Sequence, residues 1–146
     1  MAASALLPVL ALLLMPCAAL SDDTTAKALP DAARRSYATT FRDFSLAVCI
    51  GQAYNASPSA SADALSSASG LNEWSQFDLE KGGDAISKLV GRTLARPYQS
   101  FQGPSVRLDL MKCIDMYHSA ELARLVQLYV AHPRASYARD NALAKR

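Results

Sequence analysis

Three residues that can take part in covalent catalysis stand close together near the C-terminal end of the sequence: Cys113, Asp115 and His118. A cysteine activated by a nearby histidine is a common enzymatic nucleophile. On a helix, however, positions 113 and 118 are about 140° apart, so these two side chains do not share a face. Cys113 also belongs to an apolar stripe, whereas a catalytic thiol must be accessible to its substrate. We therefore predict that the cluster is not catalytic and that the protein is not an enzyme.

The other polar residues offer no better candidate for a catalytic, metal or cofactor site. The 2 His and 3 Cys residues match no zinc-ligand spacing. Gly82 and Gly83 follow no predicted strand, so they do not form a phosphate-binding loop, and Glu73 and Glu80 are isolated carboxylates. The 15 Lys+Arg nearly balance the 13 Asp+Glu, and no basic stripe with interleaved aromatic residues indicates nucleic-acid binding. We expect no metal and no cofactor.

The elements that must position any functional residue follow an apolar leader. Residues 5–14 are uniformly apolar, and Pro16 precedes Cys17 and Ala19 at the two small-residue positions of a signal-peptidase site. We predict a signal peptide over residues 1–19 and export of the mature chain. An uncleaved membrane anchor and a lipid-modified Cys17 are the alternatives. Pro8 and Pro16 disfavour the anchor, and Pro16 disfavours lipidation.

The mature chain is predicted to be a small, all-α, single-domain bundle of about five helices, because apolar residues recur at helical spacing and no strand alternation is found. Residues 20–36 are expected to be flexible, residues 37–133 to form the helical domain, and residues 134–146 to form a basic, disordered tail. The expected helices begin after Thr40, near Ser61, at Asp78, at Arg107 and after Ser119. Gly70 is expected to end the second of them.

Removal of the leader leaves two cysteines, Cys49 and Cys113, each on the apolar face of its own predicted helix. Two cysteines in a small exported domain usually pair. We predict a disulfide bond between the first and fourth helices; two buried free thiols are the alternative.

Two segments of the chain resemble a known family. The first is the run from Phe44 to Ile50, followed by Ala53 and Tyr54. The second is Lys-Cys-Ile-Asp-x-Tyr-His-Ser, which begins at Lys112, together with the residues around it at 110–122. Over residues 37–129 the chain resembles the type VI secretion amidase immunity proteins of Gram-negative bacteria. The Gly82-Gly83 pair and the tail beyond residue 130 depart from the family pattern.

The resemblance implies a periplasmic, all-helical and often homodimeric protein. Its partner would be a peptidoglycan amidase effector, a papain-like Cys-His enzyme delivered by neighbouring cells, whose active-site cleft it would occlude. The loop between the third and fourth helices, residues 98–106, is expected to enter that cleft. Lys112, Asp115 and His118 are interpreted as mainly structural residues.

The residues themselves favour the same loop, because exposed aromatic side chains beside Gln, Ser and Gly make good contact residues. We predict partner contacts from two segments: Tyr98, Gln99, Ser100, Phe101, Gln102 and Ser105 in the loop, and Glu73 and Trp74 before the third helix. Alternatively, Tyr98 and Phe101 fold back onto the core, and Trp74 anchors packing. The rival class of protein is a small exported helical ligand- or lipid-binding protein, although two cysteines are few for a disulfide-dense carrier.

Overall fold

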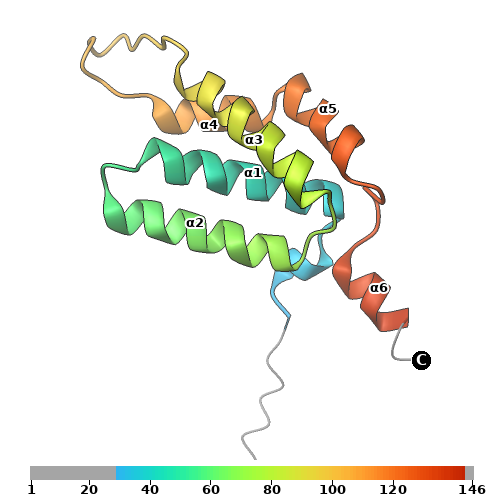
Figure 1. Cartoon of the computed structure of the whole chain (residues 1–146). Coiled ribbons are helices and arrows are strands. Elements are labelled where there is room, and N and C mark those ends of the chain that lie inside the picture. Colours follow the sequence, from blue (N-terminus) through green and yellow to red (C-terminus); the bar gives the residue numbers. More distant parts are fainter. Residues whose placement is uncertain (1–28, 144–146) are drawn as a thin grey trace, which may run out of the picture.

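A computed structural model describes residues 29–143 as a bundle of helices (Figure 1). The predicted all-α class is confirmed, and this part of the chain contains no strand. The predicted signal peptide over residues 1–19 lies outside the described residues. The elements are a short 3-10 helix η1 (Asp31–Arg34) and the α-helices α1 (Tyr37–Ala53), α2 (Pro58–Glu73), α3 (Leu79–Leu94), α4 (Asp109–Tyr117), α5 (Ala120–Tyr129) and α6 (Tyr137–Leu143).

Three helices differ from their predicted bounds: the first two as described below, and the fourth because α4 begins at Asp109 rather than at Arg107. The first helix begins at Tyr37 rather than after Thr40, since the Ser36 side chain accepts a hydrogen bond from the backbone N–H of Thr39 at 3.2 Å. The second helix has Pro58 in its first turn and runs through Gly70 to Glu73. Gly70 therefore does not end α2 as predicted.

The central helix is α1, which packs against α2, α3, α4 and α5 (Figure 1). Its contact with α2 is close at Gly51, where a Cβ atom would lie only 2.7 Å from Cδ2 of Leu65. A similar approach occurs at Gly82 in α3, where a Cβ atom would lie 3.0 Å from Cδ2 of Phe77. Helix α3 is continuous through Gly82 and Gly83, the pair that departs from the family pattern. Because Gly82 has no side chain, the Phe77 ring can pack edge-on against Phe41, with a centroid distance of 4.9 Å.

The predicted disulfide bond is confirmed. Cys49 in α1 is bonded to Cys113 in α4, with a Cα–Cα distance of 5.7 Å, and both residues are fully buried. The bridge lies within the hydrophobic core that fills the space between the helices, and the largest fully buried apolar side chains in that core are Phe41, Ile86, Val90, Met116 and Leu122. A covalent bond therefore joins the central helix to the helix that follows the predicted binding loop.

The prediction of a disordered tail over residues 134–146 is wrong for residues 137–143, which form α6. The Tyr137 ring packs edge-on against Trp74 at a centroid distance of 4.7 Å, and the Tyr37 hydroxyl donates a 2.8 Å hydrogen bond to Asp140. Burial, followed by this hydrogen bond, raises the pKa of Tyr37 to about 12. The tail is ordered by residues far away in the sequence, which helical periodicity alone does not reveal.

Within the described residues, no helix is both long enough and apolar enough to cross a membrane.

Removing the disulfide bond tests the covalent tie between α1 and α4. The bond closes a loop with a sequence separation of 64, and its loss frees the unfolded chain. We expect the Cys49→Ala/Cys113→Ala variant to lose about 2–5 kcal/mol of unfolding free energy. Urea denaturation followed by circular dichroism measures this loss, and an unchanged midpoint would show that the bridge does not contribute.

Candidate functional site

The segment between α3 and α4 projects from one end of the bundle (Figure 1). Two successive turns shape its tip: the N–H of Gly103 donates to the Ser100 carbonyl, and the N–H of Val106 donates to the Gly103 carbonyl, each at 3.3 Å. The Ser100 hydroxyl also accepts from the N–H of Gln102 at 3.1 Å. Gly103 has φ 144°, a backbone conformation that side-chain-bearing residues rarely adopt. The tip therefore has a defined turn structure that depends on glycine at position 103.

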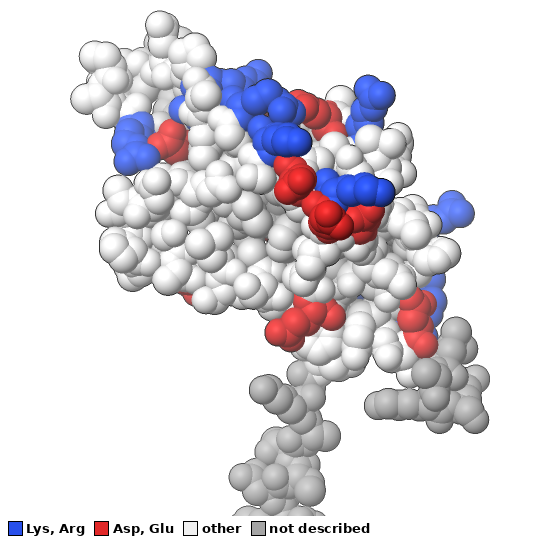
Figure 2. All heavy atoms as spheres, viewed as in Figure 1, with Lys and Arg blue, Asp and Glu red and all other residues white. Residues whose placement is uncertain are grey.

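Phe101 lies at this tip with its whole side chain in solvent; its relative exposure is 111%. Gln99, Gln102 and Ser105 are also exposed. The alternative in which Phe101 folds back onto the core is therefore wrong. Figure 2 shows no charged atoms on the tip, whereas Lys and Arg atoms gather beside its base, over α3. An uncharged, aromatic tip of this kind is suited to a partner surface that excludes water.

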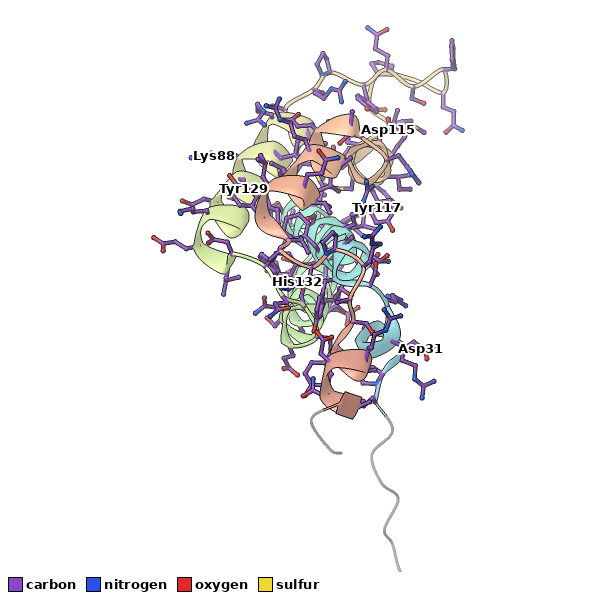
Figure 3. All side chains as sticks on the ribbon, turned by 90° about the vertical axis from the view of Figure 1, so that its right-hand side faces the viewer. Asp31, Lys88, Asp115, Tyr117, Tyr129 and His132 are labelled. Atoms are coloured by element: carbon purple, nitrogen blue, oxygen red, sulfur yellow. A yellow bond between two sulfur atoms is a disulfide. The ribbon has the colours of Figure 1, made fainter. Side chains whose placement is uncertain are left out.

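Tyr98 behaves differently from Phe101, because its side chain lies against α4. Its hydroxyl donates a 2.6 Å hydrogen bond to Asp115, which lies close to the loop at this end of the bundle (Figure 3). The cationic groups of Arg96 and Lys112 lie 5.9 and 5.8 Å from the centre of its ring, within cation–π range. The hydrogen bond to Asp115 is the main reason that the pKa of Tyr98 is raised above its ordinary value. Tyr98 thus holds the base of the loop, and Phe101 forms its tip.

Charged residues hold the two ends of the segment together. The ammonium group of Lys112 donates to the Leu94 carbonyl at the end of α3 at 2.9 Å and to Asp109 in the first turn of α4 at 3.1 Å. Arg107 donates to the same Asp109 carboxylate at 2.8 Å and to the Ala53 carbonyl at the end of α1 at 3.0 Å. The hydrogen bonds from Arg107 and Lys112 hold the pKa of the Asp109 carboxyl below its usual range.

Lys112 and Asp115 were interpreted from the sequence as structural residues, but no positioning role was predicted for this network. Their spacing predicts that the two side chains share one face of a helix. Their hydrogen-bond partners could not be predicted from the sequence, because Asp115 and Tyr98 are separated by 17 positions, and Lys112 and Leu94 by 18. Only the fold brings these groups together.

The second predicted contact segment lies away from the loop. Trp74 caps the C-terminal end of α2 and packs against Tyr137 in α6, at the opposite end of the bundle (Figure 1). The alternative reading, in which Trp74 anchors packing, fits this position. Glu73 beside it is exposed. The structure therefore does not bring Glu73 and Trp74 together with the loop residues.

The cysteine and histidine considered first are not arranged as a catalytic pair. Cys113 is fully buried and bonded to Cys49, so it has no free thiol. His118 caps the C-terminal end of α4, with its ring edge-on to Tyr117 at 5.1 Å. No group of three or more potential metal-ligating side chains occurs within residues 29–143.

A cross-linked helical domain that presents one preorganised, uncharged loop has the form of a protein that acts by binding another macromolecule. The family model Tai4, described as type VI secretion system (T6SS) amidase immunity protein, matches residues 39–126. This match covers more than half of the chain and includes both the loop and the run from Lys112 to Ser119. The chain belongs to this family of immunity proteins, and the alternative of a ligand- or lipid-binding protein is not favoured.

Solved structures share the fold. One chain, from work on new type VI-secreted toxins and self-resistance proteins in Serratia marcescens, is 24% identical, with a TM-score of 0.70 over 92% of this chain and 98% of that chain. Another comes from the effector–immunity system Tae4/Tai4 of Salmonella typhimurium, as a selenomethionine variant. It is 22% identical, with a TM-score of 0.59 over 68% of this chain and 95% of that chain. None of the curated proteins compared with this sequence matches it.

Proposed function

We propose that this immunity protein neutralises a peptidoglycan amidase effector by inserting residues 98–106 into the catalytic cleft of the enzyme. The observation that carries the proposal is the fully exposed Phe101 ring at the tip of a loop whose two ends are fixed. The family assignment supports an amidase as the partner. A papain-like amidase, whose nucleophile lies in a groove, offers a concave site that such a tip fits.

Two physical terms favour insertion. Burial of one aromatic side chain contributes about 1.5–3 kcal/mol relative to exposure. A loop that already has its bound shape loses little conformational entropy on binding. The exposed side chains of Gln99, Gln102 and Ser105 surround the aromatic tip and offer hydrogen bonds to the walls of the cleft. Hydrolysis stops because the loop occupies the space that the substrate needs.

Truncation of the tip tests this proposal. If Phe101 is a hot spot, Phe101→Ala should weaken amidase binding by at least about 2 kcal/mol, or roughly 30-fold. The melting temperature should be unchanged, because the ring has no packing partner to lose. Calorimetric titration of the amidase measures the affinity. Leu79→Ala is the matched control, since Leu79 is also an exposed apolar residue (55%) but lies at the start of α3. Equal affinities for Phe101→Ala and wild type would show that the loop is not the plug, that is, the segment that fills the catalytic cleft.

We also propose that the protein forms a homodimer through an apolar surface groove of about 420 Å³. The groove lies between α1, α2 and Leu110 of α4, and its lining residues are Ala47, Ile50, Tyr54, Ala60, Asp63, Ala64, Ser67 and Leu110. Met111 and Ile114 extend the apolar surface along α4, with 49% and 45% exposure. Exposed apolar side chains beside an apolar groove are typical of protein interfaces.

The oligomeric state tests this second proposal. Leu110→Asp places a charge in the groove, and burying that charge against a second copy would be costly. We expect wild type to be a dimer in light-scattering chromatography and Leu110→Asp to be a monomer. Leu128→Asp, at a 61% exposed position on α5, should remain dimeric. A wild-type monomer, or a Leu110→Asp dimer, would refute this interface.

We further propose that a signal peptidase cleaves the chain after Ala19 and that the mature protein acts in the periplasm. Peptidoglycan amidases meet their substrate in that compartment. The support is the apolar leader with Cys17 and Ala19 at the cleavage-site positions. N-terminal sequencing of protein released from the periplasm should begin near Leu20. Full-length protein recovered from membranes would contradict cleavage.

A further inference from the structure

We infer that Lys112, Asp115 and Tyr98 are positioning residues that hold the inhibitory loop in its binding conformation before the amidase arrives. This inference rests on the proposed plug function of residues 98–106. It assigns these three residues a role in affinity through the shape of the loop. Tyr98, predicted above as a contact residue, would act through its hydrogen bond to Asp115 rather than through a contact of its hydroxyl with the enzyme.

Lys112 joins the two ends of the loop segment. Its ammonium group donates to the last turn of α3 through the Leu94 carbonyl and to the first turn of α4 through Asp109. The Lys112 side chain is only 12% exposed, so these bonds are largely shielded from water. A cation beside the carbonyl end of α3 is also favoured by the helix dipole. One side chain therefore fixes the separation of the two helix ends from which the loop projects.

Asp115 fixes the direction in which the loop leaves. Its carboxylate accepts the 2.6 Å hydrogen bond from the Tyr98 hydroxyl, three residues before the tip residue Phe101. The Tyr98 ring stands near Lys112 and Arg96, which hold its face by cation–π contacts. Charge-assisted hydrogen bonds of this length are stronger than neutral ones. Without the hydrogen bond between Tyr98 and Asp115, residues 98–106 would sample other directions. Binding would then lose free energy to the conformational entropy of reordering them.

Three variants test the hydrogen bond between Tyr98 and Asp115 with minimal change to the core. Tyr98→Phe removes only the hydroxyl, and Asp115→Ala removes the carboxylate that accepts its hydrogen bond. The double variant shows whether the two act through each other. Glu121→Ala is the matched control, because it breaks an exposed ion pair between α5 and Arg92 of α3 that does not involve the loop. Lys112→Met keeps an apolar stem while removing both of the ammonium group's hydrogen bonds.

Two readouts are needed, and only one of them involves the amidase. In the free protein, millisecond hydrogen exchange reports the hydrogen-bonded amides of Gln102, Gly103 and Val106. We expect this exchange to accelerate in the Tyr98→Phe, Asp115→Ala and Lys112→Met variants, and to be unchanged in Glu121→Ala. Amidase affinity should fall by about threefold to tenfold in each single variant of the pair. The double variant should bind no more weakly than either single one.

The outcomes separate this inference from the plug proposal. Unchanged exchange in Tyr98→Phe, or losses of affinity that add in the double variant, would overturn the positioning role. If Tyr98→Phe lost amidase affinity and Asp115→Ala did not, the positioning role would also be overturned, because the hydroxyl would then contact the enzyme directly. Failure of the plug itself would be seen separately, as a Phe101→Ala variant that binds like wild type while the exchange results still hold.

Discussion

The disulfide bond between Cys49 and Cys113 is the constraint on which the end of the molecule that carries the 98–106 loop depends. Helix α4 has only 9 residues, and an isolated helix of that length is not stable in water. The bond fixes its middle to α1, the central helix of the bundle. At its C-terminal end, Arg42 of α1 donates to the Tyr117 carbonyl at 2.9 Å, and the Tyr117 hydroxyl donates to Asp43 at 3.2 Å. A short helix thereby becomes a rigid base for the loop that precedes it.

The run from Lys112 to Ser119, which carries the resemblance to the immunity family, can be understood from the faces of α4. Cys113 and Met116 point into the core and are fully buried. Lys112 and Asp115, one helical turn apart, face the loop, where they hold Leu94 and Tyr98. One short run of sequence therefore supplies the covalent tie, the core contact and the support of the loop. The run that carries the family resemblance therefore lies beside the proposed contact residues rather than among them.

Sequence patterns predicted the features that arise from local or strongly constrained chemistry. Helical spacing of apolar residues located α3, the Ser119 cap located α5, and the cysteine count predicted the disulfide bond. Features that depend on distant contacts were missed. Helix α6 is ordered by Trp74 and Tyr37, which lie far from it in the sequence. The different positions of Tyr98 and Phe101 could not be read from two aromatic residues in one loop, because only Tyr98 has a partner on α4.

Photo-crosslinking from the loop tip tests whether residues 98–106 enter the catalytic cleft of the amidase. A benzophenone amino acid at position 101 would replace one exposed aromatic ring with another and should preserve the fold. Irradiation of the complex with the amidase should give a cross-link that peptide mass spectrometry places among the residues lining the catalytic cleft. The same probe at position 128, on α5, should give no cross-link in the cleft. If the probe at position 101 forms no cross-link to the amidase, or cross-links only outside the cleft, the loop is not the plug.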